Sequence, residues 1–139
     1  GRISSMGEVA RATRESGGIT IGVIPESLEK IEFADRDSHE LHVVKDMRER
    51  KGKIESLADS FLILPGGAGT LEEFFEIWVG RFLKFHNKPI VILDPFDLYQ
   101  PLLNLIDHLE SENFVKPGQR ELLFWANDVD QALDFISKQ

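Results

Sequence analysis

Short apolar runs alternate along this chain with segments of helical period, and this alternation constrains the fold more than any other feature. Strands that alternate with helices of ordinary length form a mostly parallel sheet, because each crossover returns the chain to the same end of the sheet. We therefore expect an α/β fold with helices flanking the sheet, in one domain over residues 1–139. The expected strands lie at residues 19–24, 41–44, 61–64, 89–93 and 122–125, and the expected helices at 5–15, 46–58, 70–84, 97–109 and 128–137.

Several of these helices carry end signals. Asp46, Asp97 and either Asn127 or Asp128 can each cap a helix N-terminus, and Gly17 with Gly18 supplies a left-handed stop. Residues 25–40 are polar, acidic and weakly periodic. We expect this segment to be a surface loop that can carry or cover a site.

The composition argues against several classes of function. A formal net charge of −8 at pH 7 would repel nucleic acid or an anionic membrane. No apolar run approaches the roughly 20 residues of a membrane helix, and the first residues are not those of a signal peptide. The chain has no cysteine, and its four histidines lack the spacing of a helical metal pair. We expect a cytoplasmic protein with no metal, no membrane and no nucleic acid as partner.

A glycine-rich turn follows the expected strand at 61–64. Gly66, Gly67 and Gly69 allow backbone N–H groups to approach a phosphate, and the dipole of the next helix adds positive potential. A plain strand-to-helix turn also uses small residues, but the flanking strand and helix favour phosphate binding. No Gly-Lys-Ser/Thr follows, and the glycine spacing differs from the dinucleotide fingerprint.

Thr70 and Glu73 stand three residues apart at the expected start of that helix, as in a capping box. In that role the Glu73 carboxylate satisfies only backbone donors. A carboxylate beside a phosphate would repel it, unless the carboxylate faces the sugar or the base. There it can stabilise positive charge or handle a proton, and the spacing leaves both roles open.

Two cations, Arg50 and Lys51, fall on the stripe of the 46–58 helix that is expected to face inward. Burying a cation is costly unless an anion accompanies it. A local acid can be that anion, or the side chains can reach the helix rim. We favour a phosphate or carboxylate ligand. The other members of the stripe are Met47, Ile54, Leu57 and Ala58.

Aromatic side chains crowd the helix after the glycine turn beyond what one buried stripe requires. Core packing with some exposure would account for them, and so would the apolar face of a homodimer. We favour the dimer. The residues are Phe74, Phe75, Trp78, Phe82 and Phe85.

The motif Pro-Gly-Gly-Ala-Gly-Thr-Leu-Glu-Glu at 65–73 is preceded by Met-Arg-Glu-Arg-Lys at 47–51. With these paired motifs the chain resembles the LOG ("lonely guy") family, the cytokinin riboside 5′-monophosphate phosphoribohydrolases. Members have often carried the label lysine decarboxylase, but nothing here identifies a Schiff-base lysine for a pyridoxal cofactor. The resemblance covers nearly the whole chain, including residues 6–7, 22–25, 42–47 and 86–89.

The resemblance implies hydrolysis of the N-glycosidic bond of a nucleoside 5′-monophosphate, AMP or an N6-modified AMP, to free base and ribose 5-phosphate. It also implies a Rossmann-like homodimer that uses no metal or other cofactor. Arg50 and Glu73 occupy the positions of the family's catalytic pair. The family's substrate-contacting positions fall here on Glu32, Arg50, Lys51, Gly66, Gly67, Ala68, Gly69, Thr70 and Glu72.

Three features depart from the family pattern. The family's usual strand–helix–strand unit and glycine-rich loop precede the helix that here begins near Ser5, and we expect this chain to lack them. Ser4 and Ser5 stand in place of Gly-Leu, and Val79 and Gly80 in place of a threonine and a tryptophan. The alternative to an enzyme is therefore a non-catalytic nucleotide-binding or carrier module of the same fold.

Overall fold

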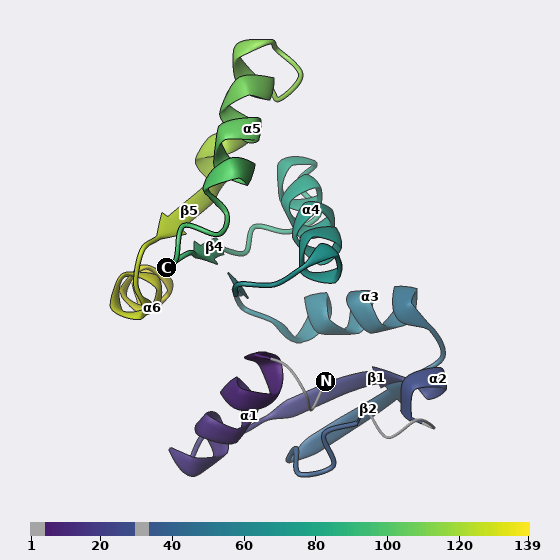
Figure 1. The fold of residues 1–139 in the computed structure, drawn as a ribbon. Coiled ribbons are helices and arrows are strands. Elements are labelled where there is room, and N and C mark those ends of the chain that lie inside the picture. Colours follow the sequence, from purple (N-terminus) through teal and green to yellow (C-terminus); the bar gives the residue numbers. More distant parts are fainter. Residues whose placement is uncertain (1–4, 30–33) are drawn as a thin grey trace. The chain divides into compact units, whose positions relative to one another are not determined.

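The computed structural model describes residues 5–29 and 34–139, which form helices and parallel strands (Figure 1). This confirms the expected α/β class. The chain divides into two compact units, residues 1–58 and 59–139. The strands pair within two sheets, one in each unit, whereas the sequence predicts a single sheet. One domain over the whole chain stays a prediction.

The first unit holds a two-stranded parallel sheet. β1 (Ile21–Pro25) pairs with β2 (Glu40–Val44), and α3 (Met47–Leu57) packs against β1. As predicted, Asp46 caps α3, and its carboxylate accepts a hydrogen bond from the Glu49 N–H at 2.9 Å. The other elements are α1 (Ser5–Glu15), which matches its expected range, and α2 (Glu26–Glu29), a short helix within the segment predicted to be a loop.

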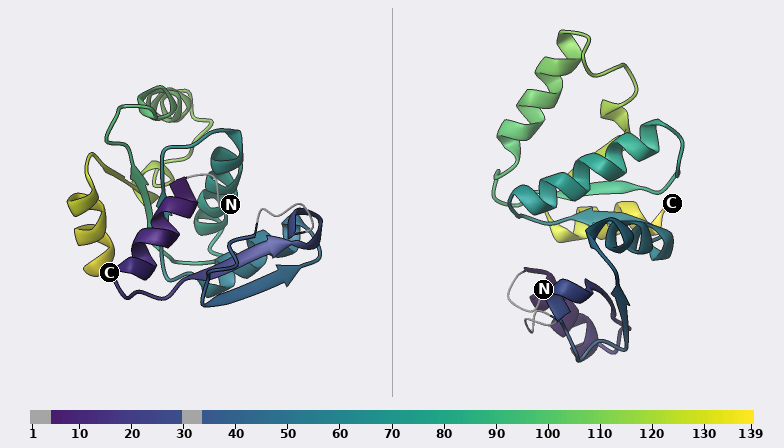
Figure 2. Two further views of the ribbon diagram at one scale, coloured as in Figure 1. Left: turned by 60° about the horizontal axis from the view of Figure 1, so that its bottom comes forward. Right: turned by 90° about the vertical axis from the view of Figure 1, so that its right-hand side faces the viewer.

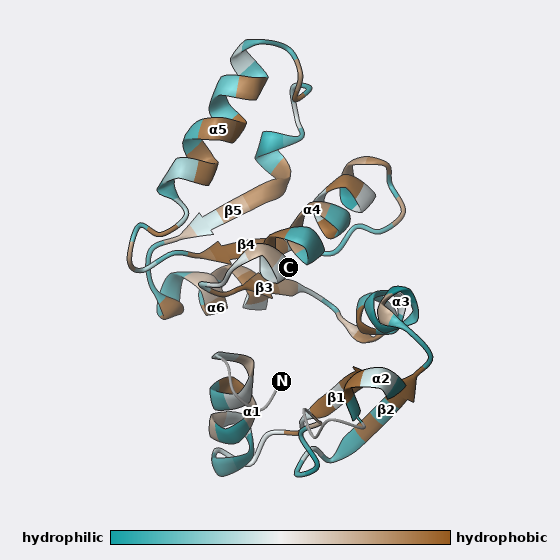
Figure 3. Ribbon diagram, turned by 45° about the vertical axis from the view of Figure 1, so that its right-hand side comes forward, coloured by the Kyte–Doolittle hydropathy of each residue, from teal (hydrophilic) through white to brown (hydrophobic). Residues whose placement is uncertain are grey.

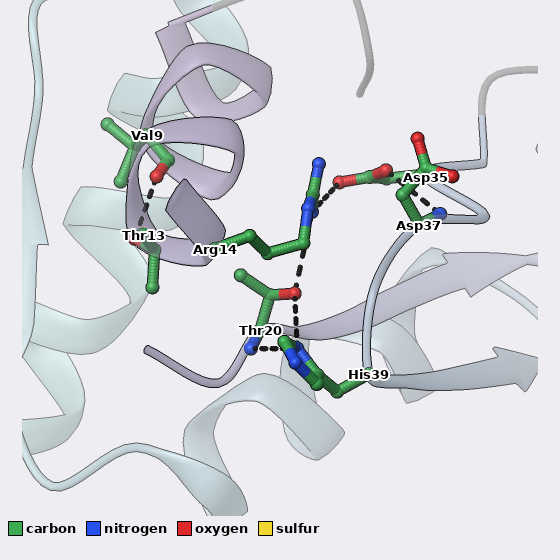
Figure 4. Close-up of polar contacts among 7 residues, drawn as sticks. All are labelled: Val9, Thr13, Arg14, Thr20, Asp35, Asp37 and His39. Carbon is green, nitrogen blue, oxygen red and sulfur yellow. Dashed lines mark hydrogen bonds and ion pairs between the residues drawn. The ribbon is translucent and has the colours of Figure 1, made fainter. Parts of the chain in front are cut away.

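A polar network joins the end of α1 to the segment before β2 (Figure 4). Arg14 Nη1 lies 2.9 Å from Asp35 Oδ2 and 3.4 Å from Thr20 Oγ1. The buried Thr20 donates its N–H to Nδ1 of His39 at 3.1 Å. β1 begins directly after Thr20, at Ile21, rather than at the predicted residue 19.

The second unit holds a three-stranded parallel sheet in the order β3-β4-β5. In the sheet register, Ile90 of β4 pairs with Phe61 of β3 on one side and with Leu123 of β5 on the other. The elements are β3 (Phe61–Ile63), α4 (Ala68–Phe82), β4 (Ile90–Leu93), α5 (Gln100–Ser111), the short 3₁₀ helix η1 (Arg120–Leu122), β5 (Leu123–Ala126) and α6 (Val129–Ser137).

The centre of this unit is β4, which is buried along its whole length and is apolar throughout (Figure 3). Val91 and Leu93 pack with Ala126 and with Ala132 of α6. The alternate residues of β4 point to the opposite face, where α4 lies (Figure 2, right). A continuous apolar run is expected for a parallel strand covered on both faces.

Two of the crowded aromatics of α4 belong to this core. Phe74 is fully buried and Trp78 is 4% exposed, and their rings stack at 5.6 Å between centroids. The Trp78 indole N–H donates to the Gln119 carbonyl at 2.8 Å, which joins α4 to the segment before β5. For these two residues core packing is therefore the correct interpretation.

Two predicted helix starts are wrong. α4 begins at Ala68 with Gly67 as its N-cap, so Thr70 lies inside the first turn and does not form a capping box with Glu73. α5 begins at Gln100 after an N-cap at Tyr99, and Asp97 instead adopts a left-handed conformation with φ of 55°. Pro101 falls in the first turn of α5, as expected.

Across residues 5–29 and 34–139, no helix combines the length and the apolar character needed to span a bilayer.

We expect Asp35→Asn to destabilise the protein at pH 7 by about 1 kcal/mol, because it removes the partner of Arg14. The hydrogen bond from Arg14 and the attraction between the two charges lower the pKa of Asp35, although partial burial opposes them. A lowered pKa stabilises the fold above the unfolded value, about 3.9. This stabilisation is lost as the pH falls through the folded value, so the difference between the two proteins in urea titrations should shrink as the pH falls below the unfolded value.

The matched control is Asp134→Asn, which breaks a pair of 2.7 Å between Asp134 and Lys138 on α6. Both side chains there are about 70% exposed, so solvent screens the pair. Equal losses of stability in the two variants would contradict a special role for Asp35.

Candidate functional site

The glycine turn between β3 and α4 presents an uncovered helix N-terminus. Gly67 is the N-cap, no side chain caps the helix, and the first turn contains no acidic residue. The N–H groups of Ala68, Gly69 and Thr70 therefore lie in a first turn that provides no intrahelical acceptor. Gly67, Ala68 and Gly69 are exposed. This arrangement suits an anion, because the donors and the positive end of the helix dipole coincide.

The three glycines of the turn differ in what the fold requires of them. At Gly66, a Cβ would collide with the Thr70 side chain, whose own Cβ would lie 3.0 Å away. At Gly67 and Gly69, a Cβ would meet no atom within 4 Å. Close packing thus requires glycine at residue 66 only, and the positions that side chains of residues 67 and 69 would occupy are open space.

The two acidic residues of the motif lie further along α4. Glu72 is exposed and Glu73 is half-buried, and both take part in polar or electrostatic contacts. Glu73 follows Gly69 by four residues and Thr70 by three, so all three share one face of the helix. In a helix the Cα–Cβ bonds tilt toward the N-terminus, so the side chain of Glu73 begins in the direction of the turn.

Tyr99 supports the turn from the start of α5, a role that the sequence reasoning missed. Its hydroxyl donates to the carbonyl oxygens of Leu64 at 2.9 Å and Gly66 at 3.2 Å. The side chain is 4% exposed, and burial raises the pKa of the phenol above its usual value. The sequence feature that could have indicated this role is the position of Tyr99 after the carboxyl end of β4, because parallel sheets bind ligands at the carboxyl ends of their strands.

Asp94 in turn holds Tyr99. Its buried carboxylate accepts the Tyr99 N–H at 2.9 Å, and its own N–H donates to the Ala126 carbonyl of β5 at 2.9 Å. The carboxylate that serves the start of α5 is therefore Asp94, directly after β4, and not the predicted Asp97.

Arg50 and Lys51 belong to the first unit, where both are half-buried on α3. The Arg50 Nε donates to the Val23 carbonyl of β1 at 3.2 Å, which fixes the base of the guanidinium on the sheet. The predicted inward stripe is wrong at its ends, because Met47 and Leu57 are 45% and 43% exposed.

The structure thus places the predicted site residues in two groups, each described within its own unit. Residues 66–73 form one continuous turn and helix start, and Arg50 and Lys51 form the second group, on α3. Glu32 lies outside the described residues. Within the described ranges, no three histidine, aspartate or glutamate side chains are grouped as metal ligands.

Parallel strands with a glycine-rich turn leading from a strand into a helix define a Rossmann-like α/β protein. The family model described as "Possible lysine decarboxylase" matches residues 6–136. Curated relatives carry the name "Cytokinin riboside 5'-monophosphate phosphoribohydrolase". The chain belongs to this family, the LOG family that its motifs resemble.

Three of these relatives show how far the similarity extends. A Rhodococcoides fascians protein is 44% identical over 136 residues, which cover 97% of this chain and 69% of that protein. A Mycobacterium tuberculosis protein is 43% identical over 133 residues, which cover 96% and 71% of the two chains. An Arabidopsis thaliana protein is 39% identical over 131 residues, which cover 94% of this chain and 58% of the plant protein.

We expect Gly66→Ala and Gly69→Ala to have opposite effects on the stability of the protein. The methyl group at residue 66 forces the turn or the start of α4 to move, so the free energy of unfolding should fall by about 1–3 kcal/mol. The methyl group at residue 69 lies in open space on a helix, so stability should hold or rise by up to about 1 kcal/mol. Denaturant titrations measure both values.

Gly69→Ala should also change the affinity for a ligand, although it leaves the protein stable. Gly69→Ala is expected to weaken the binding of a phosphorylated ligand, because a methyl group at the glycine turn hinders the close approach of the phosphate to the backbone. A stable Gly69→Ala variant with unchanged affinity for AMP would contradict a phosphate site at this turn.

Proposed function

We propose that this chain hydrolyses the N-glycosidic bond of a nucleoside 5′-monophosphate, AMP or an N6-modified AMP, releasing the free base and ribose 5-phosphate. The observation that carries the proposal is the uncovered first turn of α4, with open space in front of Gly67 and Gly69. The names of the curated relatives support the same reaction.

The phosphate binds at that first turn in this proposal. The protein as a whole carries a formal charge of −8, so a dianion needs a local source of positive potential. The N–H groups of the turn and the helix dipole supply such potential. The family resemblance assigns further cationic substrate contacts to Arg50 and Lys51. The binding energy of the phosphate then positions the ribose for the reaction.

Glu73 is the residue that acts at the sugar. As the bond from C1′ to the base nitrogen breaks, its electron pair leaves with the base and C1′ gains oxocarbenium character. A carboxylate near C1′ stabilises that charge. A water oxygen then bonds to C1′, and the proton that the water loses balances the one that the base gains.

Arg50 completes the catalytic pair. A guanidinium can bind a phosphate through two parallel hydrogen bonds, or it can orient the leaving base and Glu73. Its Nε contact with the Val23 carbonyl limits its motion and suits either task. The remaining proposed substrate contacts are Glu32, Lys51, Gly66, Gly67, Ala68, Gly69, Thr70 and Glu72.

We further propose that the protein works as a homodimer in the cytoplasm. α4 and its C-cap, Leu83, expose an apolar stripe at four-residue spacing, formed by Phe75, Val79 and Leu83, which are 40%, 45% and 52% exposed. Side chains at this spacing lie on one face of a helix, and a two-fold interface would bury two copies of the same face. The exposed Phe85 follows the stripe.

The first test of the activity is release of free base and ribose 5-phosphate from AMP, followed by chromatography. We expect Glu73→Gln to lower kcat by about 10²–10⁴-fold while AMP still binds, since the amide cannot stabilise positive charge as a carboxylate does. Arg50→Ala should also lower kcat/KM strongly.

The controls change the same residue types on the same helices. Glu76→Gln lies three residues further along α4 and Arg48→Ala lies on the exposed side of α3, and neither should change the rate by more than a few-fold. If the wild-type protein binds AMP but releases no base, the hydrolase proposal fails and a nucleotide-binding or carrier module replaces it.

The dimer has its own test. Val79→Glu places a charge in the centre of the apolar stripe, so we expect a dimeric wild-type protein to become monomeric in sedimentation velocity experiments. Leu133→Glu on α6 changes an equally exposed leucine outside the stripe and should leave the mass unchanged. A monomeric wild-type protein would refute the dimer.

A further inference from the structure

We propose that Tyr99 is a positioning residue of the phosphate site: by holding the Gly66 carbonyl, its hydroxyl sets the direction in which the Gly67 N–H points. This inference rests on the proposed function, because it adds the N–H of Gly67, the N-cap, to the proposed donors for the substrate's phosphate and names the residue that orients it. The sequence motif ends at Glu73, and Tyr99 is the N-cap of a different helix, α5.

The contact between the two segments is specific. One hydroxyl group reaches two carbonyl oxygens on either side of Pro65, that of Leu64 at 2.9 Å and that of Gly66 at 3.2 Å. Pro65 has no N–H of its own. Tyr99 therefore fixes both the residue that leaves β3 and the first peptide group of the glycine turn.

The planar peptide group links the Gly66 carbonyl, which Tyr99 binds, to the N–H of Gly67. The described peptide bonds are all trans. In a trans peptide the C=O and the N–H of the same planar group point in opposite directions. The carbonyl of Gly66 faces the Tyr99 hydroxyl, so the N–H of Gly67 in the same group points away from Tyr99.

A restraint on this peptide group is needed because glycine flanks it on both sides. The rotation that would reverse the group changes ψ of Gly66 and φ of Gly67, and glycine adopts such conformations with little steric cost. The glycines that let the backbone approach a phosphate thus also let the donor turn away. A hydrogen bond to the carbonyl opposes that rotation.

Tyr99 is itself held firmly enough to act in this way. Its ring is buried, and its N–H is bonded to Asp94, whose own N–H extends the ladder between β4 and β5. The hydroxyl must keep its proton to donate, and burial raises the pKa of the phenol, so the donor form persists at neutral pH. The turn is thereby tied to the most buried strand of the unit.

Loss of the Tyr99 hydroxyl should weaken the binding only of ligands that carry a phosphate. Tyr99→Phe keeps the ring and removes only the hydroxyl, so we expect the Kd for AMP to rise about tenfold. The Kd for adenosine, which has no phosphate to place at the turn, should stay within about twofold. KM for AMP should rise more than kcat falls. Isothermal titration calorimetry and initial rates measure these values.

Ser111→Ala is the matched control. It also removes one hydroxyl that donates to a backbone carbonyl on α5, that of His108 at 2.7 Å, but it lies at the far end of the helix. It should leave both affinities unchanged. If Tyr99→Phe weakens AMP and adenosine equally, or weakens neither, the positioning role is refuted.

A second measurement covers the case in which Tyr99→Phe does not fold. The chain contains one tyrosine, so growth on 3-fluorotyrosine labels residue 99 alone. We expect AMP to shift the ¹⁹F resonance of the folded wild-type protein and adenosine to leave it in place. An AMP complex with an unmoved resonance would overturn the inference. A wild-type protein that binds AMP without cleaving it would instead refute the proposed hydrolysis and leave this inference standing.

Discussion

The burial of β4 on both faces is the constraint on which the second unit depends. Ile90 to Leu93 are covered by α4 on one side and by α6 on the other, and the strand pairs with a neighbour along each edge. A shift of register by one residue would move each side chain of β4 to the opposite face, against a helix that packs around a different set of side chains. The carboxyl ends of β3 and β4 are therefore fixed side by side. Both segments of the candidate site that belong to this unit begin at those two ends.

The glycine turn lies at these ends, and its three glycines have different roles although they are the same residue type in the sequence. Gly66 packs against Thr70 and serves the fold, whereas Gly67 and Gly69 face open space, where we propose that the ligand binds. Tyr99 and Asp94 hold the turn from the next strand. Side chains of the core thus restrain a backbone whose glycines would otherwise leave it loose, and binding of an anion costs less when its donors are already oriented.

The sequence predicts the helices and strands well where periodicity and burial agree, and less well where a single local signal decides. Asp46 caps α3 as its position predicts. Thr70 and Glu73 match a capping box in spacing, yet the smaller Gly67 ends the turn earlier and becomes the N-cap. Tyr99 could not be assigned to the site from sequence alone, because its partner Gly66 lies 33 residues away and only the parallel pairing of β3 and β4 brings them together. The same limit applies to Arg50 and Lys51, whose predicted roles depend on contacts between distant segments.

A carboxylate beside a phosphate site needs a physical justification in a protein that is already acidic. Glu73 follows Gly69 by four residues, which corresponds to about 6 Å along the helix axis. The first turn of α4 contains no acidic residue, so the positive end of the dipole is not neutralised where the phosphate is proposed to bind. An anionic ligand anchored at that end extends its sugar past the turn, and the carboxylate then lies beside the sugar and away from the phosphate. In that arrangement the negative charge of Glu73 opposes binding of the phosphate only weakly, and it favours the positive charge that develops at C1′.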